Sequence, residues 1–311
     1  MSSGAKVVSH AIKEVTPGVT PTTGQWDVLR LTGNTLTPTP NLEQSEEITD
    51  SRLSQGNIIT SVDINGDLSA ELSFGTFDEW LAAGFYGEWV DDVLTVGEKR
   101  STFSVAKSYR DVNVYALFKG AHVRTMGIEI PGEGKVTLSL GLSCMDYEDA
   151  TTPFATTVNP ATATPFISSI NVGSIEVDGQ VLEGQACISG MSINLDNNLQ
   201  TQRCLGSGKL GPGALIETTA DITGSVTMAW SKKSWEIWKH QMTRKTIALE
   251  FPITDSEGNE YVFHFPAVEV DGEMPSGGKS DLLEVTLNYT VAKQSPTITR
   301  AKAVTEPDPE L

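Results

Sequence analysis

Residues Thr60 to Phe74 read TSVDINGDLSAELSF, and residues Thr218 to Trp230 read TTADITGSVTMAW. In the first stretch, the even-numbered positions from 62 onward are apolar or glycine, and the odd-numbered positions carry acidic, amide or hydroxyl side chains. The second stretch alternates in the same way from Thr219 to Met228. Strict alternation predicts β-strands that have one buried face and one solvated face.

The two stretches also match each other as an internal repeat. A shift of 158 residues superposes them without a gap and pairs Thr60 with Thr218, Asp63 with Asp221, Ile64 with Ile222, Gly66 with Gly224 and Trp80 with Trp238. Further along, the alternating VTLSLGL at 136–142 corresponds to LEVTLNY at 283–289. Because the order and type of the segments agree, we expect two diverged copies of one structural plan.

A short helix is predicted after each alternating stretch, at the same offset. FDEWLAAG at 77–84 places apolar residues at i, i+3 and i+4 before a glycine, and 231–244 places its large apolar residues on one stripe. We favour a role in core packing for these aromatic side chains over a role in sugar binding. The predicted core anchors are Phe77, Trp80, Trp235 and Trp238.

The expected fold is mainly β, with two duplicated β-sandwich domains that each carry one flanking helix. Segments rich in Pro, Thr and Gly, and an acidic end, suggest the boundaries. The predicted parts are an N-terminal arm at 1–25, a first domain at 26–148, a linker at 149–165, a second domain at 166–292 and a flexible C-terminal tail at 293–311.

Charge and composition exclude several classes of protein. The chain has 40 acidic and 22 basic residues and a formal charge of −18, which argues against a protein that grips nucleic-acid phosphates. No stretch is apolar enough for a membrane-spanning helix, and the first 13 residues do not resemble a signal peptide. The three cysteines lack C-x-x-C spacing, so we expect reduced thiols.

No catalytic or metal-binding motif stands out. The four histidines have no partners at metal-ligand spacing, and neither a nucleophile elbow nor a phosphate-binding loop occurs. Asp63, Asn65 and Asp67 have the 1, 3, 5 spacing of a calcium loop, but the turn glycine that such a loop needs at position 6 is replaced by Leu68. We expect no enzymatic activity, no metal and no cofactor.

The first half resembles a known family in four segments. These are TPTTGQWDVLRLTGNTL at 20–36, SEEITDSRL at 45–53, INGDLSAELSFGTFDEWLAAGFYGEW at 64–89 and YALFKGAHV at 115–123. They resemble the tail tube proteins of long-tailed bacteriophages, over about residues 17–146. The second half lacks the S-E-E-I-x-D-x-R run and keeps only the strand and helix pattern.

The resemblance implies a virion protein that assembles in the host cytoplasm into stacked rings, whose inner strands close a β-barrel around a lumen that conducts DNA. It also implies a tape measure protein, a tail terminator and a distal tail protein as partners, with no membrane insertion by the chain itself. If the hydrophobic faces of the strands fill the sandwich, the side chains on the opposite face are candidates to line the lumen. The alternative is that these residues, most of which are acidic, are solvated on the outer surface of the tube. The candidates are Asp63, Asp67, Glu71, Asp221, Thr223 and Glu284.

Ring size follows from the repeat. Family rings of six domains with about four lumen strands each would contain about 24 strands, which at a spacing of about 4.8 Å and a tilt of about 40° give a backbone diameter of roughly 48 Å. That width accommodates a DNA duplex. Two domains per chain would supply six domains from three chains, so we expect trimeric rings with pseudo-sixfold symmetry.

The stretch from Gly33 to Ile58 is too long for an ordinary hairpin loop, and we expect an arm that reaches a neighbouring subunit. Its charged candidates are Glu46, Glu47, Asp50 and Arg52. Alternatives stay open: another virion structural protein such as a baseplate or decoration protein, a porin or adhesin-like module, a non-viral β-sandwich binding module, or a β-sandwich hydrolase.

Overall fold

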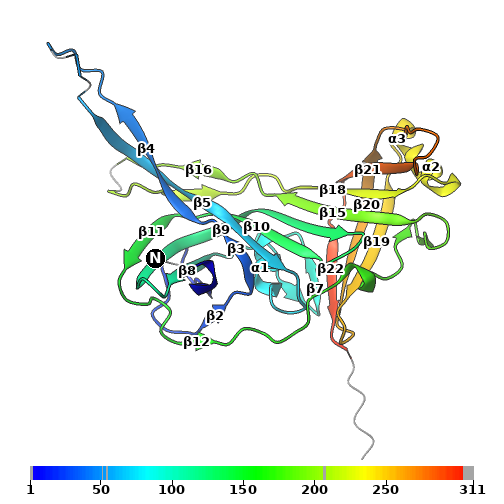
Figure 1. Cartoon of the computed structure of the whole chain (residues 1–311), viewed down its shortest axis with the longest axis horizontal. Helices are drawn as coiled ribbons and strands as arrows, with labels where there is room; N and C mark the ends of the chain where they lie inside the picture. Colours follow the sequence, from blue (N-terminus) through cyan, green and yellow to red (C-terminus); the bar gives the residue numbers. More distant parts are fainter. Residues whose placement is uncertain (1–2, 51, 54, 206–207, 304–311) are drawn as a thin grey trace, which may run out of the picture.

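The computed structural model describes residues 3–50, 52–53, 55–205 and 208–303, and most of its regular structure is β-strand (Figure 1), as predicted. The strands of the first half are β1 (Val7–Lys13), β2 (Trp26–Val28), β3 (Leu31–Asn34), β4 (Thr37–Gln44), β5 (Asn57–Glu71), β6 (Trp89–Val90), β7 (Val93–Thr95), β8 (Phe103–Tyr109), β9 (Val114–Pro131), β10 (Thr137–Ser143), β11 (Asp146–Ala150) and β12 (Val158–Asn159).

The strands of the second half are β13 (Glu176–Val177), β14 (Gln180–Val181), β15 (Ile188–Asp196), β16 (Gln200–Gln202), β17 (Ala214–Ile216), β18 (Asp221–Ala229), β19 (Ile247–Thr254), β20 (Glu260–Asp271), β21 (Glu284–Val291) and β22 (Thr297–Ala301). The helices are α1 (Asp78–Gly84), α2 (Lys232–Trp238) and α3 (His240–Thr243), and single 3-10 turns lie at Gly4–Lys6 and Ser169–Asn171.

One antiparallel sheet, which we call the long sheet, runs through both halves in the order β4, β5, β10, β9, β15, β18, β21, β20. The halves meet where β9 pairs with β15, with Gly127 opposite Asn194 and Ile130 opposite Met191. The backbone of one half therefore continues the hydrogen-bonded ladder of the other.

Strand β9 belongs to two layers because it is long enough to leave one sheet and enter another. Its first part lies between β8 and β11, and its last part lies between β10 and β15. Strand β1 pairs with β8 and extends this second layer over the first half. The main hydrophobic core is continuous between the halves and includes Leu68 and Phe118 of the first and Val226 and Phe263 of the second.

The predicted alternation is present in both stretches. On β5, Ile64 and Leu68 are buried while Asp67 and Ser69 are exposed, and β18 buries Ile222, Val226 and Met228 on one face. The apolar face of each strand packs into the core, which is the arrangement that period-two patterning requires.

The helices lie where the sequence predicts them. Helix α1 follows Phe77 and packs on β9, with Trp80 and Leu81 buried. Helix α2 begins after Ser231, whose side chain accepts a hydrogen bond from the Ser234 backbone amide while the Ser234 hydroxyl accepts from the amide of Ser231. This reciprocal capping satisfies amide donors that a helix start otherwise leaves unpaired.

The observed elements also enter segments that the sequence assigned to connections. Residues 7–13, within the expected N-terminal arm, form β1, and residues 297–301, within the expected flexible tail, form β22 between β20 and β7. Residues 304–311 of that tail lie outside the described residues. In the expected loop at 33–58, residues 37–44 instead pair with β5 as a hairpin, and Pro38 and Pro40 are tolerated there because β4 is an edge strand.

Candidate lumen face and assembly surfaces

The face of the long sheet that points away from the core carries polar side chains in rows across the strands. One row crosses seven strands in register and consists of Ser69, Ser139, Gly127, Asn194, Thr223, Thr290 and Glu269. The next row consists of Glu71, Thr137, Glu129, Ser192, Ser225, Asn288 and Asp271. We call this surface the polar face.

All six residues proposed from the sequence as lumen candidates lie on the polar face: Asp63, Asp67, Glu71, Asp221, Thr223 and Glu284. Two of the carboxylates are held by cations. Arg203 lies 2.5 Å from Asp63, and Lys135 lies 2.6 Å from Glu71. A third, Asp221, accepts a hydrogen bond of 2.7 Å from the side-chain amide of Asn198.

Sequence reasoning missed four acids of the same face: Glu129, Asp196, Glu269 and Asp271. They lie on β9, β15 and β20, whose alternation is shorter or interrupted by a bend. The alternation of Met191, Ile193 and Leu195, all buried, was the signal that could have placed β15 in the sheet.

The proposed arm residues gather at the end of the β4–β5 hairpin, which projects from the rest of the molecule (Figure 1). Glu46, Glu47, Asp50 and Arg52 are all exposed there. We call residues 43–50 the hairpin tip.

The long sheet ends in two backbone edges. Within the described residues, β3 and β4 pair only with β5, so their other edge has no strand partner. At the far end, Glu269–Asp271 of β20 pair with β21 on one side, whereas the ladder with β19 on the other side stops at Val268. Exposed edges of this kind are templates for pairing with another chain.

A polar network ties the second half to the first away from the long sheet. Arg300 on β22 forms an ion pair with Asp78 of α1, and its Nε lies 2.8 Å from Asp92. The Tyr261 hydroxyl donates to Asp78 and accepts from the Gly75 amide at 2.8 Å. Burial, reinforced by the nearby Asp78 carboxylate, raises the pKa of Tyr261, so its hydroxyl stays protonated and can donate.

The predicted core anchors divide between the halves. Phe77 and Trp80 are buried, and Trp80 stacks on Phe103 at a ring separation of 4.0 Å. Trp238 is half-buried against the core and donates to the Gly272 carbonyl at 2.9 Å. Trp235 was wrongly assigned to the core: its side chain is 38% exposed, with the Lys239 ammonium 3.6 Å from the ring centroid.

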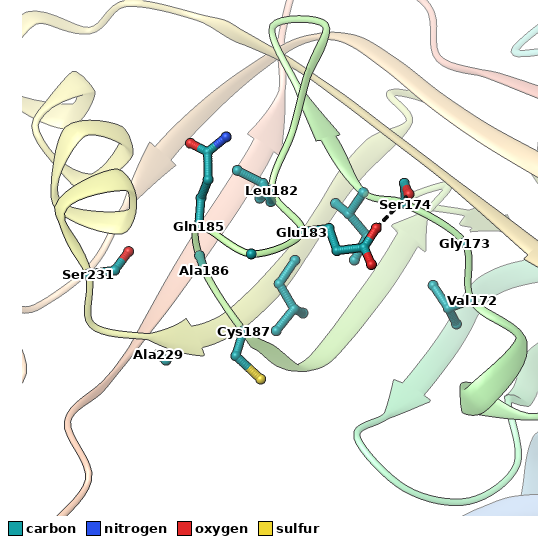
Figure 2. A pocket seen from close by; sticks show the side chains of 13 residues that line it. Val172, Gly173, Ser174, Leu182, Glu183, Gln185, Ala186, Cys187, Ala229 and Ser231 are labelled. Atoms are coloured by element: carbon teal, nitrogen blue, oxygen red, sulfur yellow. Dashed lines mark hydrogen bonds between the residues drawn. The ribbon is translucent and has the colours of Figure 1, made fainter.

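A surface groove of about 670 Å³ lies between β15, the start of α2 and the segment before β13. Figure 2 shows Glu183 turned toward Ser174, whose hydroxyl donates to it at 3.4 Å, with Cys187 also on the lining. No base, nucleophile and cation converge among the described lining residues, so the groove offers no recognisable catalytic chemistry.

Other chemistry is equally sparse in the described part of the chain. No group of three or more His, Cys, Asp or Glu side chains is arranged to hold a metal ion there. Among the described helices, none has the length and apolarity needed to cross a membrane. Cys144 is buried, Cys187 and Cys204 are exposed, and all three are free thiols.

Comparison with known proteins identifies a family. No curated protein is similar to the chain at a significant level. The family model described as phage tail tube protein matches residues 4–291, nearly the whole chain and both halves of the long sheet. The chain therefore belongs to the phage tail tube protein family, the structural proteins of the virion tail tube.

Proposed function

We propose that three copies of this chain form a ring with pseudo-sixfold symmetry, and that stacked rings form the tube through which the genome leaves the virion. The observation that carries this proposal is the β9·β15 junction, where one half continues the sheet of the other within a single chain. A ring repeats that junction between chains.

In this ring the two halves of the chain act as duplicated domains, and the registers of their strands support that interpretation. The ladder of β3 with β5 shifts between Leu31 and Gly33, and the ladder of β15 with β18 shifts between Ile188 and Gly190. Gly33 faces Ser69 and Gly190 faces Thr227; after the shift of 158 residues, Ser69 falls on Thr227, and Gly33 falls on Met191, one residue from Gly190.

The same correspondence between the two halves identifies the strand edges that would close the ring. Strand β20 corresponds to β9, and β3 with β4 corresponds to β15. Glu269–Asp271 of one copy would therefore pair with the free edge of β3 and β4 in the next copy, as β9 pairs with β15 inside the chain. Such a contact is heterologous, and three repetitions close it without leaving an open edge.

In this ring the polar face lines the lumen. Its carboxylates repel DNA phosphates, and its hydroxyl groups offer only neutral contacts, so a duplex slides without being held at each ring. Assembly in the host cytoplasm and contacts with a tape measure protein, a tail terminator and a distal tail protein belong to the same proposal, by analogy with the family.

Electron microscopy of purified assemblies tests the ring. Averaged end views should show three chains and six similar lobes around a lumen wide enough for duplex DNA. Six chains in one ring, or filaments without a lumen, would overturn the proposal.

Virions that carry Asp63→Lys, Asp67→Lys and Glu71→Lys together test the polar face. We expect normal tubes and slower genome ejection, because three positive charges in each chain would hold phosphates. The matched control replaces the same residues by Asn, Asn and Gln, which removes the charge without inverting it. Equal ejection rates in the wild type and the lysine variant would place these acids outside the lumen.

A further inference from the structure

Helices α2 and α3 carry a surface unlike the rest of this acidic chain. Residues 232–245 contain five Lys or Arg and one acid, whereas the whole chain has 22 basic and 40 acidic residues. We call the outward part the basic helix surface; its members are Lys232, Lys233, Trp235, Lys239, Met242 and Arg244.

The basic helix surface is separate from the side of the helices that holds the fold. Ile237 and Ser234 are buried and Trp238 packs against the core, so contacts within the chain already occupy the inner side of α2. On the outer side, Trp235 is 38% exposed and Met242 is 69% exposed. Trp, Met and Arg are enriched at contact surfaces between proteins, and this surface exposes all three.

The hairpin tip has the complementary chemistry. Glu43, Glu46, Glu47 and Asp50 are exposed carboxylates, and Ile48 is 98% exposed among them. The tip thus presents an apolar side chain surrounded by negative charge. The groove of Figure 2 is a poorer match, because its charged lining residue is the acid Glu183.

The two surfaces lie at opposite ends of the molecule. The hairpin tip projects at one end of the long axis, and α2 and α3 lie at the other (Figure 1). Strands β15 and β18 extend between these ends. Copies stacked head to tail along the strands would bring the tip of one copy to the helices of the next.

We infer that the hairpin tip of one copy docks on the basic helix surface of a copy in the adjacent ring. Ile48 contacts Trp235 and Met242, and the carboxylates of the tip face Lys232 and Lys239. This inference rests on the proposed stacking of rings, and it assigns the contact that joins one ring to the next.

Charge reversal tests the contact. Lys232→Glu with Lys239→Glu should lower the sedimenting, polymerised fraction about tenfold while the unfolding temperature stays unchanged, because like charges across an interface are strongly unfavourable. Adding Glu46→Lys and Glu47→Lys to the same chain should restore long tubes. Lys6→Glu, an exposed charge change elsewhere, is the control. Wild-type tubes from the Lys232/Lys239 variant, or no rescue by the swap, would overturn the inference.

Cross-linking of wild-type tubes gives an independent result. A zero-length carbodiimide reagent should join Glu46 or Glu47 to Lys232 or Lys239, and salt that separates the rings should abolish these links. Tubes of trimeric rings that yield no such links would overturn this contact and leave the proposed function intact. Absence of trimeric rings from all samples would instead overturn the proposed function.

Discussion

Helices α1 and α2 each follow the alternating strand of their half, but they bury their aromatic side chains to different extents. The shift of 158 residues pairs Trp80 with Trp238, and Phe77 with Trp235. In the first half, Trp80 is 3% exposed because β8 lies against it and β1 extends that layer. In the second half, β19 follows α2 and α3, and within the described residues its outer edge pairs with the two residues of β13 and, through one isolated bridge, with Val172. Trp235 therefore stays on the surface.

This difference shows that the helix pattern alone does not decide burial. Both segments place aromatic residues at helical spacing, and both form the helix that the spacing predicts. The second layer that covers α1 comes from β1, about 70 residues earlier in the chain. The second half has a less extensive cover, and the face it leaves open is the basic helix surface.

The largest expected effect separates the two tryptophans directly. Trp80→Ala should lower the free energy of unfolding by about 3–5 kcal/mol, because it leaves a cavity beside Phe103. Trp235→Ala should change it by less than about 1 kcal/mol, because no core contact is lost and only the cation–π contact with Lys239 is removed. Chemical denaturation of the unassembled chain measures both.

Tube formation tests the proposed role of Trp235 in the contact between rings. Trp235→Ala should impair polymerisation even though the chain is stable, and Trp235→Phe should impair it less. Equal destabilisation by Trp80→Ala and Trp235→Ala would mean that the two halves bury their helices alike in solution.

The next prediction tests whether the strands of the two halves follow one structural plan. Gly66 and Gly224 are equivalent after the shift of 158 residues. A Cβ at Gly66 would lie 2.5 Å from the Leu36 amide nitrogen, and one at Gly224 would lie 2.1 Å from the Ser192 carbonyl oxygen. Ala at either position should cost about 1–3 kcal/mol, because the backbone must move.

Matched denaturation curves of the two alanine variants check this equivalence. Gly190→Ala is the control, because the nearest atom to its Cβ would lie 3.8 Å away. A loss at only one of the two equivalent glycines would count against a common plan for the strands.

The sequence predicts the local elements of both halves well and their long-range contacts poorly. The alternation on β5 and β18 identifies the buried face because it is a property of neighbouring residues. By contrast, the pairing of β9 with β15 and of β22 with β7 joins segments far apart in the chain. No local pattern in either segment specifies its partner.

Predictions of the candidate surfaces show the same contrast between local patterns and long-range contacts. All six predicted lumen candidates share one face because the alternation fixes it, although their position in a tube stays a proposal. The acids on β9 and β20 were missed because those strands bend and change partners. Trp235 was misplaced because helical spacing carries no information about which layer covers the helix.

A smaller effect distinguishes the ion pairs of α1. Arg300 and Asp78 join the halves, and their side chains are 29% and 13% exposed, whereas Lys13 and Glu79 are 45% and 60% exposed. Arg300→Met should cost about 2 kcal/mol, because Asp78 loses its charged partner in a poorly solvated place. Lys13→Met should cost less than about 0.5 kcal/mol.

Thermal unfolding at low and high salt distinguishes these pairs further. The contribution of the exposed pair should vanish at high salt, and most of the Arg300 effect should persist. Equal costs for the two substitutions would mean that the network between the halves adds no more than a surface ion pair.

The smallest effect concerns a histidine of the first half. His10 on β1 is 3% exposed, and neither of its ring nitrogens has a hydrogen-bond partner among the residues that the structure describes. Burial, with a smaller contribution from Arg110, lowers the pKa of His10 below its usual 6.5. Below pH 6.5 the unfolded chain binds a proton that the folded chain resists, so stability is complete above that pH and declines as the pH falls.

For one such group the slope is at most about 1.4 kcal/mol per pH unit. His10→Leu removes the titration and the unpaired nitrogens, so it should flatten the decline between pH 6.5 and pH 5 without reducing stability at pH 8. The buried His122, whose pKa burial also lowers, should retain part of the slope. An unchanged pH profile for His10→Leu would show that β1 opens before it titrates, and that the layer covering α1 is the weaker part of the first half.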